Sequence, residues 1–319
     1  IASPMGLALA LEQLAVASKF QGAKPEAQCE RIRHLEARFA ARWGGMGAVA
    51  EAFAVAYSEA GAQDEAIRWY RMALQSNDGS ASLRASEQLG NLRARTAYAR
   101  AKAAKGSRRE AAIGEARDEI VDAREALRTL ARLQPTIERA SLCASASKRL
   151  AMLETLAGRP EAAAQALRDL AAHYREAEDL ARDSGHPDLF YPALNRMAAE
   201  LVVRAAEART WTFDAAQVQA VRASLLNKAT HDPDFWCMVG QVDLELYEAL
   251  AAHRLAAQQE ALVVRYEDLH QRVAAPRLWA SVADQAEFVL EPLMSHRRGI
   301  ELKAMQALLA RLRAYAGRG

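Results

Sequence analysis

The feature that most constrains the fold is a recurring turn motif, in which a glycine is followed, after three residues, by Glu-Ala. The motif begins at Gly22, Gly61 and Gly106, and a near copy begins at Gly158. Glycine readily adopts the left-handed backbone conformation that ends a helix, and a glutamate in the first turn of the next helix favours its dipole. Alanine then allows that helix to approach the preceding one closely. Each copy therefore predicts a turn between two packed helices.

The spacing of these turns is irregular, at 39, 45 and 52 residues, which predicts helices of unequal length. Further breaks rich in Gly, Pro, Ser, Asp or His divide the rest of the chain. They begin at Ser76, Gln134, Ser184, Ala208, His231, Ala251, Ala274 and Ser295. Together the breaks predict about seven helical hairpins, a number consistent with stacked repeats.

The composition favours helix along almost the whole chain of 319 residues. Only 16 are Gly and 9 are Pro, and alternating runs of Val, Ile and Thr are missing. We therefore expect an all-α protein, an α-solenoid in which each hairpin buries its apolar face on the next. We expect helical repeats in residues 1–183 and continuous, similar repeats in residues 184–319.

Charge and cysteine content give weaker indications of location and partner. The formal net charge of +2 is too small to predict a nucleic-acid partner by itself. No apolar run approaches the length of a membrane span, so we expect no membrane partner. Three cysteines, Cys29, Cys143 and Cys237, are far apart and odd in number, which fits a reducing cytoplasm.

The hairpin around Gly61 resembles the tetratricopeptide repeat family. The matching residues alternate small and large side chains: Phe53, Ala54, Tyr57, Gly61, Ala66, Tyr70, Ala73 and Leu74. A second, partial match is the segment "WCMVG". Its Trp236, Val239 and Gly240 have the spacing of the family's Trp-x-x-Leu-Gly signature. The period here is longer than the ~34 residues of a standard repeat. The resemblance implies a right-handed solenoid with a concave groove, and it puts Glu51, Val55 and Ser58 on the inner face.

A second resemblance involves the segment from His186 to Leu201 and the segment from Asp232 to Leu246. These segments are similar to the tetratricopeptide-type domain named for binding TRAF adaptors, which also occurs in bacterial signalling proteins. By that resemblance, such repeats accompany effectors such as caspase-like proteases of the CHAT type. Because the sequence starts at Ile1 rather than methionine, we also consider a longer protein with an N-terminal effector domain outside this sequence.

The richest polar cluster is "HDPDFWC", in which His231, Asp232, Asp234 and Cys237 are candidate metal ligands or a Cys and His pair. The segment spans a helix start, so an aspartate there is better explained as an N-cap, and no second cysteine pair completes a zinc site. No nucleophile, zinc-protease, phosphate-loop or dinucleotide fingerprint occurs. We expect no catalytic activity, no metal and no cofactor.

One basic segment stands out, because no acid occurs between Glu87 and Glu110. Arg93, Arg95, Arg100 and Lys102 are its candidate binding residues, with Tyr98 on the same side of the helix as Arg95 and Lys102. Basic and aromatic side chains together contact phosphates or acidic peptides. The alternative is an exposed helix end that arginine keeps soluble.

Three functional hypotheses follow. The first is a non-catalytic scaffold that binds a peptide or a partner protein in the concave groove. The second is the regulatory part of a larger bacterial signalling or defence effector. The third is nucleic-acid binding through the basic segment.

Overall fold

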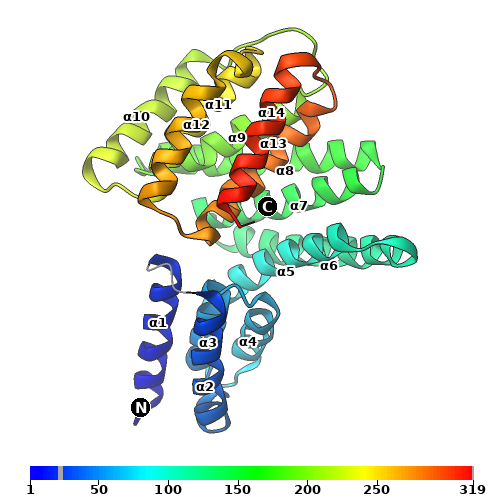
Figure 1. Ribbon diagram of the computed structural model, residues 1–319. Coiled ribbons are helices and arrows are strands. Elements are labelled where there is room, and N and C mark those ends of the chain that lie inside the picture. Colours follow the sequence, from blue (N-terminus) through cyan, green and yellow to red (C-terminus); the bar gives the residue numbers. More distant parts are fainter. Residues whose placement is uncertain (21–23, 318–319) are drawn as a thin grey trace. The chain divides into compact units, whose positions relative to one another are not determined.

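The computed structural model describes residues 1–20 and 24–317, and within them the chain forms fourteen α-helices, one short 3-10 helix and no β-strand (Figure 1). The helices are α1 (Pro4–Phe20), α2 (Pro25–Trp43), α3 (Gly47–Glu59), α4 (Gln63–Gln75), α5 (Leu83–Ala103), η1 (Gly106–Arg108), α6 (Arg109–Leu133), α7 (Ile137–Leu156), α8 (Pro160–Asp183), α9 (Phe190–Val203), α10 (Ala215–His231), α11 (Phe235–Ala251), α12 (Leu255–Arg272), α13 (Pro276–Met294) and α14 (Gly299–Tyr315). Taken in chain order, these helices make seven consecutive pairs. The predicted all-α, tetratricopeptide-like class is confirmed.

The glycine turns adopt the backbone conformation that the motif predicts. The φ angles of Gly61, Gly106 and Gly158 are 85°, 60° and 69°, in the left-handed region that side chains with a Cβ avoid. Pro160 stands in the first turn of α8, where its missing N–H leaves no hydrogen bond unmade. The fourth predicted turn, at Gly22, lies outside the described residues.

The chain divides into two compact units. Unit 1 contains residues 1–133 and 153–158, and unit 2 contains residues 134–152 and 159–319. The division therefore falls at the end of α6, with a few residues of α7 assigned to the first unit. The boundary that we expect from the sequence, between residues 183 and 184, lies at the end of α8 within unit 2.

Unit 1 is built around aromatic and alanine side chains of α3 and α4. Phe53 and Trp69 stack with their ring centroids 4.4 Å apart, and both are almost fully buried. Ala66, which the turn motif predicts at a close helix contact, has no exposed surface. The neighbouring helices α5 and α6 also run side by side (Figure 1). At Gly90 an added Cβ would come within 2.9 Å of Leu127, so glycine permits that approach.

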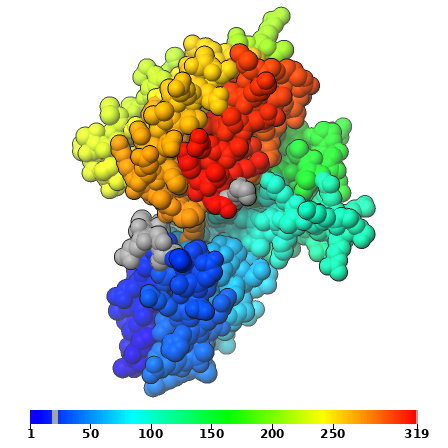
Figure 2. Space-filling model, viewed as in Figure 1, coloured from blue at the N-terminus to red at the C-terminus, as the bar shows by residue number. Residues whose placement is uncertain are grey.

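Unit 2 has its own core, in which Trp279 of α13 is completely buried. The indole ring of Trp279 meets the rings of Phe235 and Tyr266 edge to face, with centroids 5.5 and 6.4 Å apart. Figure 2 shows α12 and α14, in orange and red, side by side on the face of this unit that is turned toward the viewer.

Helix packing in unit 2 extends beyond successive hairpins. Helix α13 contacts α9, and polar side chains also join it to α7. Lys148 of α7 donates a hydrogen bond to Gln285 of α13 at 2.5 Å, and Arg149 forms an ion pair with Asp284. In a simple solenoid each repeat contacts only its neighbours. The last hairpin of this chain therefore returns to earlier helices of the same unit.

None of the described helices combines the length and the apolar composition that a membrane-crossing helix requires.

Candidate interaction site

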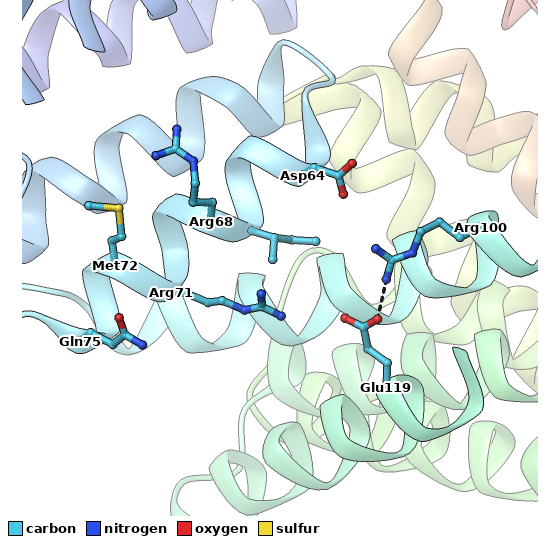
Figure 3. Close-up of a pocket in the computed structure, with 8 residues that line it drawn as sticks. Asp64, Arg68, Arg71, Met72, Gln75, Arg100 and Glu119 are labelled. Atoms are coloured by element: carbon cyan, nitrogen blue, oxygen red, sulfur yellow. Dashed lines mark hydrogen bonds and ion pairs between the residues drawn. The ribbon is translucent and has the colours of Figure 1, made fainter. Parts of the chain in front are cut away.

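A hollow of about 410 Å³ opens along the outward face of α4 in unit 1 (Figure 3). Its lining comes from α4, α5 and α6: Asp64, Ile67, Arg68, Arg71, Met72, Gln75, Arg100 and Glu119. The six residues from α4 are separated by three or one positions, which places them on one helical face. Because the eleven steps from Asp64 to Gln75 rise about 16 Å along the helix axis, the hollow follows about three turns of α4.

The opposite face of α4 explains why this stripe points outward. Ala66, Trp69, Tyr70 and Ala73 are all buried in the core of unit 1. Burial of large aromatic side chains on one side fixes the rotation of the helix. The charged stripe is consequently turned away from α3.

Unequal helix lengths extend the lining beyond α4. Helices α3 and α4 have 13 residues each, whereas α5 has 21 and α6 has 25. Since α5 packs next to α4 and is eight residues longer, its C-terminal part runs past the start of α4. Arg100 lies in that extension, and Glu119 of α6 is paired with it. Arg100 of α5 and Glu119 of α6 thus extend the lining beyond α4.

Guanidinium groups dominate the polar lining. The carboxylate of Glu119 accepts hydrogen bonds from Arg100 at 2.5 Å and from Arg93 at 3.4 Å. Figure 3 shows Arg71 and Asp64 extending toward the Arg100–Glu119 pair. Arg71 is exposed and forms no ion pair with the described residues. The hollow therefore offers a guanidinium to a ligand without first breaking an internal ion pair.

Arg68 has a different, structural environment. It donates to Glu36 at 2.6 Å, and the same carboxylate accepts from Tyr57 at 2.5 Å and from the Trp69 indole at 3.2 Å. Desolvation alone would raise the pKa of Glu36, but these hydrogen bonds outweigh it and lower that pKa. These hydrogen bonds join α2 to α3 and α4. The guanidinium group of Arg68 therefore already has a carboxylate partner within the protein.

The residues expected on the inner face of α3 do not line the hollow. The carboxylate of Glu51 accepts hydrogen bonds from the backbone N–H of Ser82 at 2.8 Å and from its hydroxyl at 2.5 Å. Val55 packs against the core and Ser58 is half-buried. The structure does not bring these three residues into the hollow, and their role in partner binding stays a prediction.

The basic segment on α5 is divided between several surroundings. Arg93 and Arg100 share Glu119, and Arg100 is exposed, as are Arg95 and Lys102. Tyr98 is only 7% exposed, so its ring cannot stack on a base or a peptide at the surface. Only Arg100 of the four predicted residues lines the hollow. The partner role of the other three stays a prediction.

The "HDPDFWC" segment is a helix cap. Asp234 is the N-cap of α11, and its carboxylate accepts a hydrogen bond from the N–H of Cys237 at 2.8 Å. His231 makes a local contact between Nδ1 and the carbonyl oxygen of Asn227. The N-cap prediction is confirmed for Asp234, while Asp232 stands at the C-terminal end of α10.

Sequence reasoning missed the polar interior of α7. Lys148 and Arg149 are 7% and 6% exposed, and Ser147 has no exposed surface. Arg71, which lines the hollow, was not singled out either. A signal for α7 existed in "CASASKRLAML", where two cations interrupt a run of small and apolar residues. No comparable local signal marks Arg71, because its importance depends on helices that follow in sequence.

Comparison with known families agrees with the resemblance to tetratricopeptide repeats that the sequence shows around Gly61. Residues 62–202 match the family model described as Tetratricopeptide Repeats-Sensor. The match covers 141 of the 319 residues, and over this segment the chain is similar to tetratricopeptide repeats. The matched segment begins one residue before α4 and includes every residue that lines the hollow. No curated protein matches the chain.

Proposed function

We propose that this chain is a non-catalytic scaffold that binds a partner protein through its helical repeats. The observation that carries the proposal is the tetratricopeptide match over residues 62–202, which contain the hollow. This family suggests a protein–protein interaction role, and its repeats are generally non-catalytic. Stacked helical hairpins present long, rigid surfaces, which suit recognition of a peptide or a partner helix.

Two surfaces are candidates for the contact. One is the inner face of α3 with Glu51, Val55 and Ser58, as the family resemblance implies. The other is the hollow on α4 with Arg71 and Arg100. The engagement of Glu51 with Ser82 favours the hollow, because a partner at α3 would have to compete with an existing pair of hydrogen bonds.

A second candidate function is the regulatory part of a larger bacterial signalling or defence effector, for example one with a CHAT caspase-like protease. The word "Sensor" in the description of the matching family favours this candidate. In that case the partner includes an effector domain, either covalently joined or separate.

We propose a cytoplasmic location for both candidates, supported by the three buried cysteines, which form no disulfide. Neither function requires a cofactor or a metal.

The test is affinity capture from the native host with the full chain as bait, followed by reconstitution with the purified candidate protein. We expect one protein to form a complex of fixed stoichiometry, measured by light scattering during size-exclusion chromatography. An unrelated helical-repeat protein of similar charge is the control bait. Capture that disappears after nuclease treatment, or failure of every captured protein to bind directly, would contradict the scaffold function.

A further inference from the structure

We propose that the hollow on α4 holds an amphipathic helix of a partner protein, with an acidic side chain of that helix bound by Arg71 and Arg100. This inference rests on the proposed scaffold function and specifies the chemistry of the partner.

The shape of the hollow favours a helix. Its α4 lining repeats every three to four residues over about three turns. Side chains at that spacing form a ridge, and a second helix packs beside such a ridge with its own side chains at the same spacing. An extended peptide places alternate side chains on opposite faces, so it would match this periodicity poorly. The volume of about 410 Å³ accommodates several side chains of a partner helix rather than its whole width.

The charge of the hollow favours an acidic side chain. Three guanidinium groups and two carboxylates line it. One of the carboxylates, Glu119, is already shared by Arg93 and Arg100, and its side chain is only 20% exposed. Arg100 is 56% exposed and has five N–H donors, so it can bind a second carboxylate while it keeps the first. Together with Arg71, it provides a cationic position that an aspartate or glutamate would complement.

Apolar residues complete the site and argue against a phosphate backbone as the ligand. Met72 is 36% exposed, and Ile67 lines the hollow with most of its side chain buried. Methionine adapts its shape to an apolar partner side chain. Asp64, at the start of α4 on the same side as Arg100 (Figure 3), would repel phosphates but would attract a lysine or arginine of a helix. The lining thus matches a helix that carries both charge signs and an apolar side chain.

The test uses photo-crosslinking in the native host, with benzoyl-phenylalanine placed in the full chain at Met72 or, in a second variant, at Ser58. We expect a partner protein to crosslink at position 72 and not at position 58. The crosslinked segment should be an amphipathic helix with acidic residues, identified by mass spectrometry. A synthetic peptide of that segment then serves as the probe for binding measurements by fluorescence anisotropy.

Charge exchange decides whether Arg71 binds the acid. We expect Arg71→Glu to weaken peptide binding at least tenfold, and a peptide with lysine in place of the matching acid to recover affinity for that variant. Arg175→Glu, at another exposed helical arginine in unit 2, is the matched control and should change nothing. Crosslinking at position 58 alone would overturn this inference and leave the scaffold function intact. Crosslinking to nucleic acid, a basic crosslinked segment, or no crosslink at position 72 would also overturn it.

Discussion

Arg149 of α7 forms an ion pair with Asp284 of α13, although 135 residues separate them in the sequence. Their side chains are only 8% and 19% exposed. The neighbouring residues Lys148 and Gln285 make a second link between the same helices, and the ammonium group of Lys148 lies 4.6 Å from the ring centroid of Phe288. Two adjacent residues on each helix therefore fix α13 against α7. This contact holds the last hairpin of unit 2 against an earlier helix of that unit.

We predict that Asp284→Ala strongly destabilises unit 2. Removing the carboxylate leaves the Arg149 guanidinium buried without this counter-charge, and breaking a buried pair in this way typically costs about 3–5 kcal/mol. The free energy of unfolding from urea titration, followed by the fluorescence of the buried Trp279, measures the effect. Glu245→Ala is the control, because its pair with Arg265 is exposed and such pairs contribute about 0–1 kcal/mol. Equal effects of the two substitutions would show that the Arg149–Asp284 pair does not stabilise unit 2.

Two glycines inside helices predict opposite effects of the same substitution. At Gly240 of α11 an added Cβ would lie 2.8 Å from Leu225 of α10 and 3.1 Å from Leu194 of α9. Gly240→Ala should therefore lower the free energy of unfolding by about 1–3 kcal/mol through overpacking. At Gly114 of α6 an added Cβ meets nothing within 4 Å. Gly114→Ala should raise stability by about 0.5–1 kcal/mol, because alanine loses less backbone entropy in a helix.

Thermal unfolding of both variants beside the unaltered chain measures this difference. A lower melting temperature for Gly114→Ala, or no change for Gly240→Ala, would contradict the packing around that glycine.

Much of the helical organisation could be predicted because its signals are local. A left-handed glycine, a proline in a first turn and an N-cap aspartate each act within a few residues, as Gly61, Pro160 and Asp234 show. The irregular turn spacing also correctly indicated helices of unequal length. The candidate site was harder to predict from such local signals. Arg100 was recognised from a run of cations, but its pairing with Glu119 depends on how α5 packs on α6.

The return of α13 to α7 could not be predicted from local pattern. The cations at Lys148 and Arg149 read as surface residues unless their partners are known, and those partners lie far along the chain. Burial of a charged side chain is favourable only with such a partner in place. The structure of unit 2 therefore depends on a contact between distant residues that neither helix specifies alone.

Acid should weaken unit 2 through His253. This residue has a φ of 52°, and its Nε2 accepts a hydrogen bond from the buried guanidinium of Arg297 at 2.7 Å. Desolvation and the charge of Arg297 lower the pKa of His253, while Glu301 opposes them. Because the folded pKa lies below the ordinary value of about 6.5, the contribution to stability is present above pH 6.5. It is lost as the pH falls through the lowered pKa, since the unfolded state then binds more protons.

Asp243 acts in the opposite direction and must be separated from His253. Desolvation raises the pKa of Asp243 to about 6, although the hydrogen bond from Tyr266 opposes the rise. Protonation of this carboxyl in the folded state favours folding as the pH falls from about 6 toward 3.8.

Unfolding free energies of His253→Asn and Asp243→Asn between pH 7.5 and 5.5 distinguish the two groups. We expect His253→Asn to remove the acid-induced loss, since asparagine tolerates a positive φ and does not titrate. An unchanged loss in that variant would exclude His253 as its cause.

Nucleic-acid binding should be weak and should depend on the exposed cations of α5. Glu119 neutralises part of the charge of Arg93 and Arg100, and the buried Tyr98 offers no stacking surface. Arg95 and Lys102 remain exposed on this helix. If each contacts one phosphate, the logarithm of the binding constant for duplex DNA should fall with the logarithm of salt concentration at a slope of about −2, since each phosphate contact contributes about −0.9.

Anisotropy titrations between 50 and 200 mM salt measure this slope. Replacing both residues with glutamate should abolish the residual binding without changing the circular dichroism spectrum, whereas Arg175→Glu should leave it unchanged. Tight binding that survives the double replacement, or a much steeper slope, would favour a nucleic-acid partner over the protein scaffold.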